Sequence, residues 1–113
     1  MTEGRETETP RDTRFPLVVP MVYRRTREPE WLEGRTINVS GSGVLFVGPQ
    51  GLEAGAPIEL RLALNSVAPG LVPDRLVCTG RIMRVAPEAA EPSGSMMAAQ
   101  FDDCRFERGL DAD

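Results

Sequence analysis

Hydrophobic and polar residues alternate in several short stretches of the chain, which is the pattern of half-buried β-strands. The clearest stretch is residues 58–64, where isoleucine or leucine occupies every second position. Polar segments rich in glycine and proline separate such stretches, and no segment has the periodicity of a strong amphipathic helix. The pattern predicts six strands at near-regular spacing, at residues 15–23, 31–39, 44–47, 58–64, 75–85 and 95–101.

Six short strands with little helix to cover them favour an all-β fold, a six-stranded antiparallel barrel, because closure removes exposed strand edges. Residues 1–13 contain almost no apolar side chains and are predicted to form a flexible N-terminal tail. The barrel domain is expected to span residues 14–106, followed by an acidic C-terminal tail at 107–113. The polar residues after position 101 are expected to fray or to form weak helix.

The composition narrows the possible chemistry. The 113 residues include no histidine and no lysine, and all 13 basic residues are arginine against 17 acidic residues, a net charge of −4. Histidine-based triads, imidazole bases, histidine metal sites and lysine Schiff bases are therefore excluded. We expect no enzyme, no metal and no cofactor. The planar guanidinium groups are suited to recognition of phosphate and purine.

Charge, hydropathy and cysteine content indicate the kind of partner, the cellular location and the redox state of the cysteines. A net acidic chain with few aromatic residues is a poor DNA or RNA binder. No apolar run approaches the length that spans a membrane, and no secretory signal is visible, so a cytoplasmic protein without membrane insertion is expected. Cys78 and Cys104 are then expected to be reduced thiols, although pairing of their strands as a hairpin would bring them close together.

A small-residue turn follows the second predicted strand, with the sequence Asn38-Val-Ser40-Gly-Ser-Gly43. An amide, a hydroxyl and glycine backbone N–H groups in such a turn can read the edge of a planar heterocycle or hold an anion. The same residues can instead cap their own turn, which spacing alone favours.

The pattern Asn38-x-Ser40-x-x-Gly43 resembles the [D/N]-x-S-x-x-G motif of the PilZ domain, a bacterial receptor module for cyclic di-GMP. The sequences flanking the motif are also similar to the family, as are segments 52–60, 80–85 and 98–101, so that the resemblance covers residues 11–106. It implies a six-stranded barrel whose loop between the second and third strands contacts the nucleotide.

The second motif of the family is R-x-x-x-R, placed before the first strand, where two arginines clamp the ligand. This chain has Arg11-x-x-Arg14, one residue short of that spacing. The resemblance therefore implies a cyclic di-GMP site made of two arginines of the N-terminal segment and three residues of the turn, namely Arg11, Arg14, Asn38, Ser40 and Gly43.

Two functions follow from the resemblance. In the first, cyclic di-GMP bridges the arginines and the turn, orders residues 5–14 against the barrel, and the change is read by a protein partner in second-messenger signalling. In the second, the altered arginine motif gives an adaptor that does not bind the nucleotide and acts through protein–protein contact.

Overall fold

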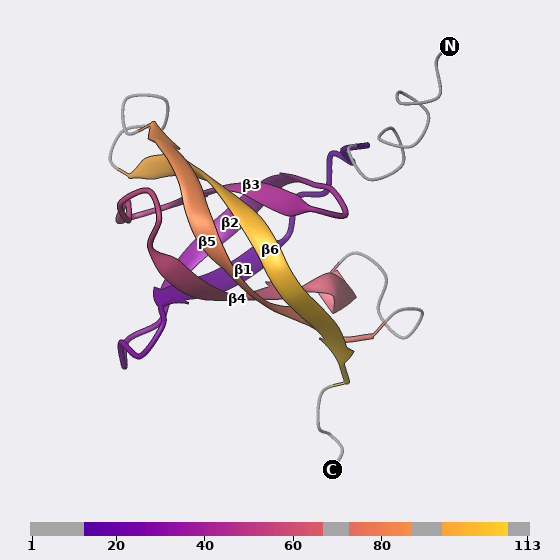
Figure 1. Ribbon diagram of the computed structural model, residues 1–113. Helices are drawn as coiled ribbons and strands as arrows, with labels where there is room; N and C mark the ends of the chain where they lie inside the picture. Colours follow the sequence, from indigo (N-terminus) through magenta and orange to yellow (C-terminus); the bar gives the residue numbers. More distant parts are fainter. Residues whose placement is uncertain (1–12, 67–72, 87–93, 109–113) are drawn as a thin grey trace.

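The computed structural model describes residues 13–66, 73–86 and 94–108. Its six strands form a closed barrel in the order β1-β2-β3-β6-β5-β4, and every neighbouring pair is antiparallel (Figure 1). A short 3₁₀ helix, η1, follows β4. The elements are β1 (Pro20–Arg25), β2 (Leu32–Val39), β3 (Gly43–Gly48), β4 (Pro57–Ala63), η1 (Leu64–Ser66), β5 (Arg75–Ala86) and β6 (Ser95–Glu107). The predicted all-β, six-stranded antiparallel barrel is confirmed.

Two strand boundaries differ from the prediction by more than two residues. β1 begins at Pro20 instead of residue 15, since Pro16 has no N–H to donate to a ladder and the chain before Pro20 has an isolated bridge, Phe15–Val39, in place of a continuous ladder. β6 continues to Glu107, where it still pairs with Arg75 of β5. The expectation of frayed or helical chain after residue 101 is therefore wrong. The polar residues there form one half of a long two-stranded ribbon (Figure 1).

The core lies between the inward faces of the strands. Along β4, Ile58, Leu60 and Leu62 are each fully buried, as the alternation predicts. Tyr23 of β1 meets Phe46 of β3 edge-to-face, with 5.1 Å between ring centroids. The Tyr23 hydroxyl donates a hydrogen bond to the Gln50 carbonyl at 2.7 Å, and burial raises the pKa of this phenol above its usual value. The core is therefore mainly aliphatic, with one aromatic pair.

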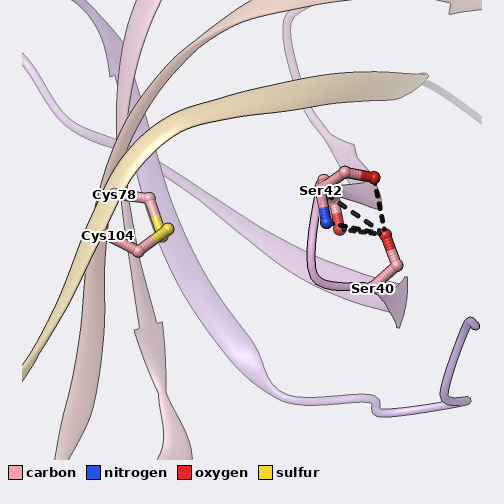
Figure 2. The surroundings of a disulfide bond; sticks show 5 residues. Ser40, Ser42, Cys78 and Cys104 are labelled. Carbon is pink, nitrogen blue, oxygen red and sulfur yellow. Dashed lines mark hydrogen bonds between the residues drawn. A yellow bond between two sulfur atoms is a disulfide. The ribbon is translucent and has the colours of Figure 1, made fainter. Parts of the chain in front are cut away.

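Cys78 and Cys104 form a disulfide, which corrects the expectation of two reduced thiols. The two residues face each other directly in the β5–β6 ladder, with Cα atoms 4.1 Å apart (Figure 2). Strand pairing holds them together even though they are 26 positions apart in the sequence. The correction follows from β6 extending past residue 101, because only then does Cys104 reach Cys78 in register.

Candidate functional site

The segment before β1 is fixed along β2 by hydrogen bonds. Phe15 and Val39 exchange two backbone hydrogen bonds, at 2.8 and 3.0 Å. Farther along, the fully buried Thr36 hydroxyl donates to the Leu17 carbonyl at 2.6 Å and accepts from the Val19 amide at 2.8 Å. A side chain thus replaces ladder bonds where the segment lacks a regular strand. Residues 15–19 are therefore positioned by β2, and they bring Arg14 to its end.

β2 contains a β-bulge that determines where Asn38 points. Thr36 pairs with Phe46 and Asn38 pairs with Leu45, which leaves Ile37 as an extra residue on β2. Thr36 and Phe46 are both fully buried, whereas Leu45 is only half-buried on the other face of β3. Without the extra residue, Asn38 would share the inward face of Thr36. The bulge turns its amide outward instead, which is a common use of bulges near binding sites.

Arg14 and Asn38 meet at this end of β2. The Arg14 Nη1 donates a hydrogen bond to the Asn38 Oδ1 at 2.7 Å, across 24 positions of sequence. Arg14 is exposed and Asn38 is half-buried. Of the two arginines expected to form a clamp, the structure brings Arg14 to the turn, while Arg11 lies outside the described residues.

Ser40 is used inside the turn. Its side chain is largely buried, with 5% of the residue exposed. The Oγ atom accepts hydrogen bonds from the backbone amides of Ser42 and Gly43, at 3.3 and 3.2 Å, and the Ser40 amide donates to the Gly43 carbonyl at 2.8 Å. Figure 2 shows this hydroxyl directed across the loop toward Ser42. For Ser40, the interpretation that the residue caps its own turn describes the contacts seen.

Gly43 is the place where the turn joins the barrel wall. It pairs with Gln100 of β6, and an added Cβ would lie only 2.3 Å from the Ala99 carbonyl oxygen. The neighbouring Ser42 carbonyl accepts a hydrogen bond from the Phe101 amide at 2.8 Å. Glycine is therefore required here by the close approach of two strands. The three motif residues have different surroundings: Ser40 and Gly43 shape the loop, and Asn38 presents its amide.

The chemistry at this site is that of a guanidinium beside a carboxamide. A guanidinium pairs with phosphate or with a guanine edge through two parallel N–H donors, and a carboxamide offers both a donor and an acceptor. The sequence identified Asn38, Ser40, Gly43 and Arg14, but not the Ile37 bulge or the Thr36 anchor. A threonine on the inward face of a predicted strand indicates a buried hydroxyl that needs a hydrogen-bond partner, as Thr36 has in Leu17 and Val19. The bulge left no signal in the alternation.

Comparisons with known proteins give the family. The family model described as PilZ domain matches residues 8–111. The inhibitor of motility MotI/DgrA of Bacillus subtilis has a similar structure, with a TM-score of 0.62 and 16% sequence identity, over 81% of this chain and 42% of that chain. That similarity concerns the fold, and this chain spans less than half of the MotI/DgrA length. A search of curated proteins found no match.

No helix in the described part of the chain is long and apolar enough to cross a membrane. The family match extends over nearly all of the sequence, and the closed six-stranded barrel with its Asn-x-Ser-x-x-Gly turn agrees with it. The chain therefore belongs to the PilZ domain family.

Proposed function

We propose that this protein binds cyclic di-GMP at the turn between β2 and β3 and relays the bound state to a protein partner in bacterial second-messenger signalling. Membership of a family of receptor modules for this nucleotide supports the proposal. The observation that carries it is the 2.7 Å hydrogen bond between Arg14 and Asn38, because it joins the arginine segment to the motif turn despite the shortened arginine spacing.

Each residue has a distinct role in this proposal. Arg14 pairs with a phosphate or with the Hoogsteen edge of a guanine, and Asn38 contacts the nucleotide through its amide. Ser40 and Gly43 keep the loop in shape beside Asn38, because the amides of Ser40, Ser42 and Gly43 are bonded within the turn. Arg11 supplies a second guanidinium from the N-terminal segment. Residues 5–14, of which 5–12 lie outside the described residues, make new contacts when the nucleotide binds, and the partner reads that change.

The proposal also includes a cytoplasmic location, no catalytic activity, no cofactor and no nucleic-acid partner. A reducing cytoplasm favours the dithiol form of Cys78 and Cys104 over the disulfide. Binding should therefore be measured both with and without a reductant.

Isothermal titration calorimetry with cyclic di-GMP tests this function. The wild-type chain is expected to bind with micromolar or tighter affinity, and Arg14→Ala is expected to weaken binding about ten- to a hundred-fold, because charge-assisted hydrogen bonds are lost. Asn38→Ala should weaken binding in the same direction. Arg105→Ala is the matched control, since Arg105 is an exposed arginine near the end of β6 that pairs with Glu107. Flat traces at high nucleotide concentration would refute the proposal.

An adaptor that does not bind the nucleotide is the second candidate. The observation that favours it is the arginine spacing, which is one residue shorter than in the family motif. This candidate predicts that cyclic di-GMP leaves the amide signals of Asn38, Ser40 and Gly43 unchanged, and that a protein partner can be recovered by pull-down. A saturable shift of those signals would exclude it.

A further inference from the structure

The outward face of β1, β2 and β4 carries a stacked group of side chains away from the Asn38 turn. The guanidinium carbon atoms of Arg24 and Arg61 lie 4.4 and 4.6 Å from the centroid of the Trp31 ring. Arg24 also forms an ion pair with Glu59, with Nη2 2.9 Å from Oε1. The Trp31 indole therefore contacts two guanidinium groups, and Glu59 neutralises the charge of one of them, Arg24.

Arg61 of β4 and Glu33 of β2 lie on either side of β1 on this face, and the exposed Arg35 lies farther along β2. Arg61 and Glu33 are exposed, and within the described ranges neither forms an ion pair. Val22 of β1 is directly opposite both of them, Glu33 on one side and Arg61 on the other. Two strand spacings, about 10 Å, therefore separate their backbones. The face presents a cation and an anion on either side of an apolar side chain.

A groove of about 550 Å³ runs over this arrangement. Pro20, Val22 and Ala63 contribute apolar surface to it. Arg61 and Glu33 are charged residues of its lining, as are Asp74 and Arg75, and Arg75 pairs with Glu107. This volume is in the range of binding sites, and the contact between the Arg61 guanidinium and the Trp31 ring restricts the arginine side chain. Little side-chain entropy would be lost when that guanidinium is paired.

We infer that this groove docks an extended segment of a protein partner in which an acidic and a basic side chain flank an apolar one. In extended chain, alternate residues point to one face, so residues i, i+2 and i+4 span about 13 Å and can reach Arg61, Val22 and Glu33 in turn. The occupant follows from charge complementarity. A polyphosphate fits poorly, since Glu33 would repel it. The inference concerns a surface separate from the Asn38 turn and does not depend on nucleotide binding.

Peptide binding tests this surface directly. The probe is a short acetylated peptide with the core Glu-Ala-Val-Ala-Lys, and the comparison peptides carry Glu or Lys at both charged positions. Trp31 is the only tryptophan of the chain, so its emission reports binding at this face, while the anisotropy of labelled peptide gives the affinity. We expect saturable binding of the Glu/Lys peptide with a change in Trp31 emission, about ten-fold tighter than either comparison peptide, and weakened by salt.

A charge reversal provides the decisive variant. Arg61→Glu should switch the preference to the Lys/Lys peptide, whereas Arg105→Glu, a reversal at another exposed arginine, should leave the preference as in the wild type. Thermal melts of both variants confirm that the barrel is folded. Equal affinity for the three peptides, no switch in Arg61→Glu, or no binding at millimolar peptide would overturn the inference. Nucleotide binding, measured with Arg14→Ala, can succeed or fail independently of these results.

Discussion

Replacing Gly43 by alanine is expected to destabilise the barrel by about 3 kcal/mol. The added methyl group would collide with the backbone of β6, which cannot move aside as a flexible side chain could. An added Cβ would lie 2.3 Å from the Ala99 carbonyl oxygen, so β3 and β6 must separate to admit it. Their ladder runs from Gly43 to Gly48 and closes one wall of the barrel. A thermal melt followed by circular dichroism should show a Tm lower by roughly 10–20 °C.

Ser42→Ala is the matched control for that experiment. Ser42 lies in the same turn, and its hydroxyl makes only a 3.3 Å contact with the Ser40 Oγ. Its loss should change the free energy of unfolding by less than about 1 kcal/mol. A Gly43→Ala variant as stable as Ser42→Ala would contradict the assignment of Gly43 to the barrel wall, and would return this glycine to a direct role in ligand contact.

Removal of the disulfide is expected to cause the second large loss of stability. Cys104→Ser removes it at the exposed partner and leaves the buried Cys78 in place. For residues 26 positions apart, the chain-entropy relation predicts that the variant loses about 3.5 kcal/mol of stability under oxidising conditions. Chemical denaturation should therefore show a lower midpoint for the variant, with a somewhat steeper slope because the unfolded chain without the cross-link exposes more surface.

A reductant supplies the control for the disulfide experiment. In a sufficient concentration of dithiothreitol, the wild-type midpoint should fall to that of Cys104→Ser, while the variant itself should not change. If reductant leaves the wild-type midpoint where it is and free-thiol titration shows two cysteines in both conditions, the disulfide is absent in solution and the protein is held by its core alone.

Alternation along the sequence was sufficient for the strands that are amphipathic throughout. β4 shows this best, since Ile58, Leu60 and Leu62 are all fully buried between more exposed neighbours. Alternation was insufficient where pairing with another strand determines the structure. β6 continues as strand through polar residues because β5 pairs with it as far as Arg75. Local polarity alone therefore predicts a frayed end, and a frayed end leaves Cys104 out of reach of Cys78.

The candidate site was only partly visible in the sequence. The motif placed Asn38 at a turn, but strict alternation placed its side chain on the same face as Thr36, which is buried. The Ile37 bulge reverses that orientation, and it depends on how β2 and β3 pair. Arg14 was a candidate only by resemblance. Its position at the turn depends on the Phe15–Val39 bridge, which no pattern in residues 10–16 indicates.

In the proposed nucleotide site, Arg14 and Asn38 contact the ligand and the Ser40–Gly43 turn supports them. A titration of isotope-labelled protein with cyclic di-GMP, followed by amide and side-chain NMR signals, tests this proposal most directly. We predict saturable shifts at the Asn38 side-chain amide, the Arg14 guanidinium and the Ser42 and Gly43 backbone amides, with the Trp31 indole unchanged. Spectra that do not move at millimolar nucleotide, or that move only at Trp31, would contradict the proposal.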